Sequence, residues 1–235
     1  MADRRGPDDG YQFGCKRHYR RQIWATFRDC LKRQGKPRAE ANALLMPSIE
    51  GSEIDVALSC GLREYNLHIV DMNPAIVATL KRRYPRINTY GVMLRQACER
   101  MAHRGVSIDV ANFDLCAQMS RTLEDQTRFA LRSGVLSPRA VVAVNMLRGR
   151  ESAEVTNTLL RCERELADLA AVNDARVADL MRQAGLSSRD RARLVMAGRL
   201  LADGHSGVYG LVRAASYVSA SRQSMLWAVY LVNRA

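Results

Sequence analysis

The sequence predicts an α/β fold, a doubly wound and mostly parallel sheet of seven strands in which the last strand runs antiparallel. Two observations carry this prediction. Short apolar segments alternate with amphipathic segments over residues 43–147, and the chain closes on two strand-like segments separated by a polar turn. Alternation of this kind is typical of a parallel sheet covered by helices on both faces. A closing hairpin adds the antiparallel strand.

A helix is expected ahead of this alternation, after a polar tail at residues 1–10. Within residues 15–34, four apolar residues recur at helical spacing, namely Ile23, Trp24, Phe27 and Leu31. Gly35 and Pro37 then end the helix. We therefore divide the chain into a basic tail and helix, residues 1–38, and a main domain, residues 39–235.

The alternating elements follow in a regular order. Strands are predicted at residues 43–46, 67–70, 87–90, 106–113 and 140–147, and helices at residues 52–60, 74–84, 92–103 and 121–133. Asn73 is the expected N-cap of the helix that begins at Pro74.

The later part of the chain departs from the alternation. Residues 151–204 predict a helical insert, which includes long helices over 151–184 and a further helix at 189–202 capped by Ser187 or Ser188. Three glycines are expected to mark a flexible link, namely Gly204, Gly207 and Gly210. The closing hairpin combines a strand ending at residue 218, a turn near 221–223 and a strand at 225–232.

Composition narrows the function classes. The chain of 235 residues carries 36 Lys and Arg against 24 Asp and Glu, a net charge of +12. This excess favours a polyanionic partner such as nucleic acid, although a generally arginine-rich proteome would produce it too.

Cysteine spacing argues against a metal site, and hydropathy argues against a membrane-spanning segment. The six cysteines form no CxxC pair, so we expect reduced thiols and no metal site. No apolar run is long enough to span a bilayer, and the first ten residues hold no apolar signal-peptide core. We therefore expect a cytoplasmic protein with no membrane association.

Two segments at predicted strand ends form a candidate nucleotide-type site. In a doubly wound sheet, ligands bind at the carboxyl ends of the strands. The first such loop spans residues 46–51, and the next strand ends on Asp71, twenty residues after Gly51 (71 − 51). This spacing lets a carboxylate accept hydrogen bonds from two ribose hydroxyls. The alternative is that Asp71 and Asn73 only cap the helix at Pro74.

The order of elements resembles the class I S-adenosylmethionine-dependent methyltransferases, in which the final strand is inserted between the fifth and sixth. The segments SIDVANFDLCAQMS and VVAVNMLRGRE also resemble methyltransferase-like proteins commonly found among bacteriophage genes, over roughly residues 40–151. The chain departs from the family at two points. The usual GxGxG loop is reduced to Gly51, and Asn-Phe-Asp-Leu stands where amino-directed DNA enzymes have an Asn/Asp-Pro-Pro-aromatic motif.

The resemblance implies S-adenosylmethionine as cofactor and a set of site residues. The expected cofactor-binding residues are Met46, Pro47, Glu50, Gly51, Asp71, Met72, Asn73 and Phe113. Asp114 is the expected catalytic residue, since its carboxylate can orient or deprotonate a nucleophile, and Asn112 can assist it. Phe113 can stack on a base or on the adenine. For Asp114, a helix N-cap, a turn residue or a cofactor contact alone are the alternatives.

Basic residues near the predicted site suggest where a substrate would bind. Lys16, Arg17 and Tyr19 combine cations with an aromatic ring, which suits phosphates and stacked bases. Arg148 and Arg150 follow the fifth strand and can guide a phosphate, or else pair with a neighbouring carboxylate.

Two functions from different classes remain. The first is methyl transfer to a nucleic acid, with DNA preferred over RNA. The second is a non-catalytic protein of the same fold that binds nucleic acid or a protein partner through its basic surface. A small-molecule or protein methyltransferase is a third, weaker alternative.

Overall fold

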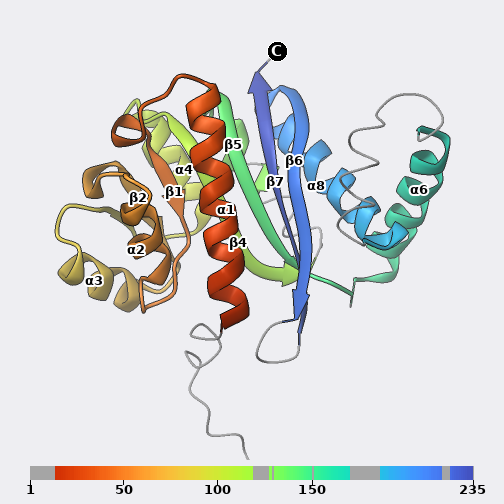
Figure 1. Ribbon diagram of the computed structural model, residues 1–235, viewed down its shortest axis with the longest axis horizontal. Coiled ribbons are helices and arrows are strands. Elements are labelled where there is room, and N and C mark those ends of the chain that lie inside the picture. Colours follow the sequence, from red (N-terminus) through yellow and green to blue (C-terminus); the bar gives the residue numbers. More distant parts are fainter. Residues whose placement is uncertain are drawn as a thin grey trace, which may run out of the picture.

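The computed structural model describes residues 14–118, 127–128, 130–149, 151–169, 186–218 and 223–234, although the side chains of residues 14–17, 115–118 and 165–169 fall outside the description. One seven-stranded sheet runs through this part of the chain, and helices cover both of its faces (Figure 1).

The sheet has the predicted topology. Its strands are β1 (Ala43–Leu45), β2 (Leu67–Val70), β3 (Asn88–Tyr90), β4 (Ile108–Gln118), β5 (Leu136–Leu147), β6 (Gly207–Val218) and β7 (Ser224–Arg234). They lie in the order β3-β2-β1-β4-β5-β7-β6. The pairs among β1 to β5 are parallel, whereas β7 is antiparallel to both β5 and β6. The prediction of a final antiparallel strand inserted between the fifth and sixth is confirmed.

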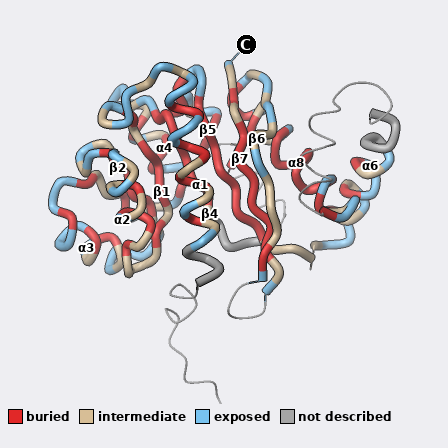
Figure 2. Tube along the Cα trace, in the orientation of Figure 1, coloured by how far each residue is buried: buried red, intermediate tan, exposed pale blue. Residues whose placement is uncertain are grey.

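Two groups of helices cover the two faces of the sheet. The described α-helices are α1 (Gly14–Arg33), α2 (Ser52–Ser59), α3 (Pro74–Arg83), α4 (Leu94–His103), α6 (Ala153–Leu169) and α8 (Ser188–His205), with short 3₁₀ turns η1 (Arg38–Glu40) and η2 (Glu64–Asn66). The apolar side chains of α1, α2 and α3 join one core cluster with the sheet, and those of α4, α6 and α8 join the other. Figure 2 shows the buried strands between these layers. No described helix is long and apolar enough to cross a membrane.

The alternation of side chains along β4 and β5 decides which residues reach each face. On β4, Val110 packs in the cluster with α1, whereas Ala111 and Phe113 pack in the opposite cluster. Successive strand residues point to opposite faces, so Asn112 and Asp114 lie on the face that α1 covers. The polar end of β4 is therefore directed toward α1 and α2.

Most predicted elements have the expected positions, and several differ at their ends. β4 continues five residues beyond the predicted end at 113, and β5 begins at Leu136 rather than at residue 140. Pro138 lies within β5 where the pairing with β4 is irregular, between the pairs Ile108–Leu136 and Val110–Val141. Proline has no backbone N–H to donate to a strand ladder, and it is tolerated at this position because the pairing is interrupted there. Large parts of the predicted helices at 121–133 and 151–184, and the turn near 221–223, lie outside the described residues.

The expected flexible link at Gly204, Gly207 and Gly210 is wrong. Gly204 lies within α8, and the other two glycines lie within β6. Close packing explains two of them, because a Cβ on Gly207 would lie 1.9 Å from the Asn233 carbonyl oxygen and one on Gly204 would lie 2.7 Å from Leu131 Cβ. These glycines thus allow two elements to approach each other.

Gly207→Ala is expected to lower the free energy of unfolding by about 1–3 kcal/mol, because the added methyl group overpacks the β6–β7 contact. Gly210→Ala on the same strand is the matched control, since a Cβ there meets nothing within 4 Å. Urea denaturation of both variants measures the difference. Equal stability of the two variants would show that β6 and β7 do not approach closely at Gly207.

Candidate active site

Polar side chains converge where the parallel strands end. The chain leaves β1 for β2 and β3 on one side and returns through β4 and β5 on the other, so the switch point lies between β1 and β4. Ligands of doubly wound folds bind at the carboxyl ends of the strands at this point. The loop of residues 46–51 and the end of β4 therefore border the candidate site.

The loop between β1 and α2 depends on its single glycine. Gly51 is the N-cap of α2 and has a φ of 64°, in the left-handed region that favours glycine. A Cβ there would lie 2.9 Å from Tyr84 Cε2. Arg83 donates to the Glu50 carbonyl oxygen at 2.5 Å and so ties the loop to α3. Two buried oxygens of this loop, Ser48 Oγ and Glu50 Oε2, have no hydrogen-bond partner.

The end of β2 carries the predicted acidic residue. Asp71 is partly exposed, and its Oδ1 accepts a hydrogen bond from the Asn73 backbone N–H at 2.7 Å. The Asn73 side chain caps α3 by accepting from the Ala75 N–H at 3.0 Å. The N-cap prediction for Asn73 is confirmed. Met72 beside it is 69% exposed, which leaves an apolar surface next to the Asp71 carboxylate.

The ends of β4 and β5 form a hydrogen-bonded cluster. Asp114 pairs with Asn145 in the strand register. The Asn145 side-chain amide donates to Asp114 Oδ1 at 3.0 Å and to the Tyr217 hydroxyl at 3.2 Å. The Asn112 amide donates to Glu53 Oε1 at 2.5 Å. The side-chain amide oxygens of Asn112 and Asn145 are buried and have no hydrogen-bond partner among the described residues, so this cluster retains two unused acceptors.

Glu53 and Asn145 belong to this site, and neither is among the site residues predicted from the sequence. Glu53 is 2% exposed, and burial raises the pKa of its carboxyl while the nearby Arg20 charge opposes that rise. Its signal in the sequence is an acidic residue four positions before Ala57, on the apolar side of α2. The signal for Asn145 is a single polar residue in an otherwise apolar strand end, VVAVNML.

Helix α1 covers the cluster from one side. Tyr19 stacks on Tyr217 with ring centroids 4.6 Å apart, and its hydroxyl donates to the Ser216 carbonyl oxygen at 3.2 Å. A cavity of about 20 Å³ remains between α1 and the strand ends, lined by Tyr19, Arg20, Ile23, Asn112, Asp114, Asn145, Tyr217 and Trp227. This volume holds roughly one water molecule, so a larger group reaching Asp114 from this side must displace α1 side chains.

The other predicted site residues have varied surroundings. Met46 is partly buried and Pro47 is buried, beside the ends of β1 and β4. Phe113 is fully buried in the opposite core cluster, which accounts for its ring by packing and leaves it away from the cluster around Asp114. Arg150 and the side chains of Lys16 and Arg17 lie outside the described residues.

Arg148 follows the second of its two predicted alternatives. Its Nε and second terminal nitrogen donate to the two carboxylate oxygens of Asp190, at 2.9 and 2.5 Å. A third hydrogen bond reaches Ser224 Oγ at 3.0 Å. The Arg148 side chain thus joins β5 to α8 and β7, and this pairing occupies the groups that would hold a phosphate.

Comparison with known proteins supports the fold assignment. No protein-family model and no curated protein matches the sequence. The structure is similar to that of a Haemophilus influenzae protein whose assignment as a methylase is provisional, with a TM-score of 0.51 at 8% identity over 92% of this chain and 99% of that chain. It is also similar to an O-methyltransferase from Bacillus cereus solved with S-adenosylhomocysteine, with a TM-score of 0.50 at 11% identity over 91% of this chain and 80% of that chain. The chain therefore has the doubly wound, seven-stranded fold of the class I methyltransferases.

Proposed function

We propose that this protein transfers a methyl group from S-adenosylmethionine to a nucleic acid. The observation that carries the proposal is the polar cluster in the C-terminal halves of β4 and β5, where Asn112, Asp114 and Asn145 lie beside the end of β1 and the loop of residues 46–51 that follows it. The fold is shared with an O-methyltransferase that was solved with the demethylated cofactor. The net charge of +12 suits a polyanionic substrate.

The residues around the switch point fit this cofactor. Asp71 offers a carboxylate for the ribose hydroxyls, and the unpartnered Ser48 Oγ offers a hydrogen-bonding group in the loop. The cofactor has no pyrophosphate, so the single Gly51 is enough for a backbone approach at one point. Met46, Pro47, Glu50, Met72 and Asn73 would border it, and Phe113 would not. When bound, S-adenosylmethionine supplies a methyl group on a positively charged sulfur.

The cluster is arranged to hold a nucleophile in line with that methyl group. Transfer needs alignment and the exclusion of water more than covalent chemistry from the protein. Asp114 would accept a hydrogen bond from the nucleophile, while Asn145 donates to its carboxylate and is itself oriented by its hydrogen bond to the Tyr217 hydroxyl. Asn112 Oδ1 is a second acceptor on the same face of β4. Two acceptors match the two hydrogens of a base amino group, and this supports an amino acceptor.

One observation favours a second function, binding of nucleic acid without catalysis. The cavity between α1 and Asp114 holds about one water molecule and not a base. A protein that retained the fold but not the reaction would have no need to open this space. The cytoplasmic location and the resemblance to bacteriophage proteins stay predictions from the sequence.

Asp71→Ala is expected to weaken the binding of S-adenosylmethionine and S-adenosylhomocysteine about 10- to 100-fold, because hydrogen bonds to a charged group contribute roughly 1.5–3 kcal/mol. Isothermal titration calorimetry of the wild type and the variant measures this. Asp29→Ala, which removes an exposed carboxylate from α1, is the control and should bind as the wild type does. No binding of either compound by folded wild-type protein would contradict the proposed cofactor.

A further inference from the structure

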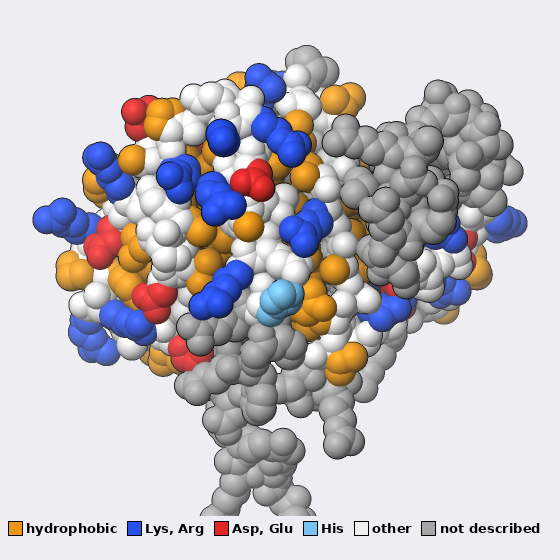
Figure 3. Space-filling view, in the orientation of Figure 1, with side chains coloured by type: hydrophobic (Ala, Val, Ile, Leu, Met, Phe, Trp, Pro, Cys, Tyr) orange, Lys and Arg blue, Asp and Glu red, His pale blue; other side chains and the backbone are white. Residues whose placement is uncertain are grey.

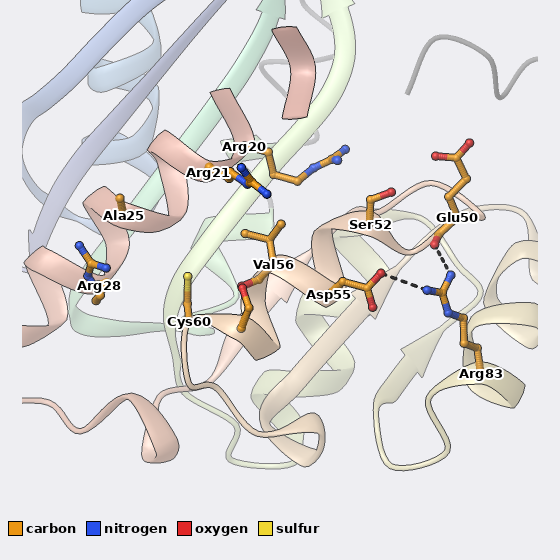
Figure 4. A pocket seen from close by; sticks show the side chains of 11 residues that line it. Arg20, Arg21, Ala25, Arg28, Glu50, Ser52, Asp55, Val56, Cys60 and Arg83 are labelled. Carbon is orange, nitrogen blue, oxygen red and sulfur yellow. Dashed lines mark hydrogen bonds and ion pairs between the residues drawn. The ribbon is translucent and has the colours of Figure 1, made fainter. Parts of the chain in front are cut away.

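A second concave site lies between α1 and α2, outside the cluster around Asp114. This α1–α2 cleft has a volume of about 920 Å³, within the usual size of ligand sites. Its lining consists of Arg20, Arg21, Ala25, Arg28, Glu50, Ser52, Asp55, Val56, Ser59, Cys60 and Arg83 (Figure 4). None of its arginines is among the site residues predicted from the sequence.

The cleft carries a positive charge. Four arginines face two carboxylates, Glu50 and Asp55, which gives a formal charge of 4 − 2 = +2. Arg83 already donates to Asp55 Oδ2 at 3.0 Å and to the Glu50 carbonyl oxygen, and Figure 4 marks both interactions. Tyr84 also donates to Asp55 Oδ1 at 2.5 Å. Asp55 is thus compensated from the α3 side. Arg28 lies 3.3 Å from the exposed carboxylate of Asp29, so Arg20 and Arg21 supply most of the remaining positive charge.

Arg20 is the unusual member of this group. It is only 7% exposed, and its charge acts on the buried carboxyl of Glu53, whose pKa burial raises and Arg20 lowers. A guanidinium stays charged in proteins, and a buried charge without a partner is costly. Arg20 also lines the small cavity beside Asp114, so it stands where the cleft and the candidate active site meet. An anionic group in the cleft would give this side chain a second anionic partner beside Glu53.

The lining identifies the ligand as phosphate groups in series rather than stacked bases. None of the described residues that line the cleft is aromatic, and the apolar ones among them are Ala25, Val56 and Cys60. Along α1, the positions of Arg20 and Arg28 are about 12 Å apart at 1.5 Å per residue. A nucleic-acid strand carries one phosphate per about 3.4 Å of B-form axis, so arginines over this length can contact separate phosphates. Figure 3 shows Lys and Arg side chains gathered over this face of the molecule.

We propose that the α1–α2 cleft binds the phosphodiester backbone of a single-stranded nucleic-acid segment and that Arg20 holds the phosphate nearest to Asp114. A charged groove that follows one backbone is the usual arrangement for single strands. An unpaired base needs no extraction from a duplex, so the only rearrangement on its way to Asp114 is the displacement of the α1 side chains that border the small cavity. The proposal rests on the proposed function only in making this strand the methyl acceptor.

Fluorescence anisotropy with a labelled 12-nucleotide single strand, its RNA counterpart and the duplex of the same sequence tests the cleft. Removal of two phosphate contacts by Arg21→Gln with Arg28→Gln should reduce the slope of log K against log salt by about 1.4 and weaken single-strand binding about tenfold at low salt. Adding Arg20→Gln should reduce the slope by about 0.7 more. The control pair Arg95→Gln with Arg139→Gln changes the net charge equally at exposed positions outside the cleft and should leave the slope unchanged.

Three results would overturn the cleft proposal: no binding of any strand, tighter binding of the duplex than of the single strand, or equal effects of the cleft and control pairs. Calorimetry with S-adenosylhomocysteine on the same variants separates this proposal from the proposed function. If the protein binds the cofactor and the cleft and control pairs bind the strand equally, the cleft proposal is wrong and the proposed methyltransferase function stands. If strand binding depends on the cleft arginines but the protein does not bind the cofactor, the proposed methyltransferase function is wrong and the cleft proposal stands.

Discussion

Asp190→Ala is expected to lower the free energy of unfolding by about 3–5 kcal/mol, because it breaks a buried ion-pair network by removing one partner. Asp190 is 0% exposed and accepts hydrogen bonds from Arg148 at 2.9 and 2.5 Å and from Arg193 at 2.9 Å. Arg193 in turn donates to Glu151 at 2.7 Å. The variant leaves two guanidinium groups without their shared carboxylate. Urea denaturation followed by circular dichroism measures the loss.

The same carboxylate also begins helix α8. Ser187 and Asp190 form a capping box in which each side chain accepts from the backbone of the other, so the variant removes one half of it. The matched control is Asp203→Ala on the same helix. Asp203 pairs with Arg128 at 3.0 Å, but its side chain is 52% exposed, so its loss should cost less than about 1 kcal/mol. Similar losses in both variants would show that the network around Asp190 does not stabilise the fold.

The dependence of stability on pH should also test the ion-pair network around Asp190. Burial by itself raises the pKa of Asp190 and of Glu151, but hydrogen bonds from Arg148 and Arg193 outweigh it and hold both pKa values below their ordinary range. A depressed folded-state pKa contributes stability above the unfolded-state pKa, near 4, and this stability is lost as the pH falls through the folded-state value. The stability of Asp190→Ala should therefore fall less steeply below about pH 4 than that of the wild type.

The positions of the strands along the chain were predictable from local signals, whereas their order in the sheet followed from the resemblance to the class I methyltransferases. Alternating apolar and amphipathic segments, with a closing hairpin, indicate seven strands along the chain but not which strands pair in the sheet. The prediction of a flexible link at Gly204, Gly207 and Gly210 was wrong because it also used only local signals. A glycine in a sequence indicates backbone freedom, whereas the need for close contact between Gly207 and Asn233 arises only when β6 pairs with β7.

The candidate site was predictable only in part, since its contacts join distant segments. Asn112 and Asp114 stand at a predictable strand end, but their partners Glu53 and Asn145 lie 59 and 31 residues away in the chain. The strand register brings Asn145 beside Asp114. Arg148 looked available for a phosphate for a similar reason, since its partner Asp190 follows 42 residues later. The sequence thus predicts where strands end, but it does not predict which side chains pair there.

Asp114→Asn is expected to reduce methyl transfer by about 10²- to 10⁴-fold while cofactor binding stays within a factor of a few, because general acid–base catalysis contributes on that scale. The substitution keeps the size of the side chain and replaces a carboxylate oxygen with an amide that cannot take a proton. Asn145 donates to Asp114 Oδ1, so the variant keeps an oxygen for this contact and directs its amide toward the nucleophile. Transfer of labelled methyl groups to single-stranded DNA, RNA and protein, with calorimetry of cofactor binding, measures both effects.

Two further variants separate the chemistry from the support around it. Asn145→Ala removes the donor that holds Asp114 and leaves the carboxylate, so Asn145 acts as a positioning residue. It should lower kcat less than Asp114→Asn does and leave the KM of the cofactor unchanged. Glu99→Gln, exposed on α4 and outside the cleft, should react as the wild type does. Equal rates for Asp114→Asn and the wild type would exclude Asp114 from the reaction. A wild type that binds the cofactor and methylates none of these substrates would favour the non-catalytic function, in which the space beside Asp114 never opens to a base.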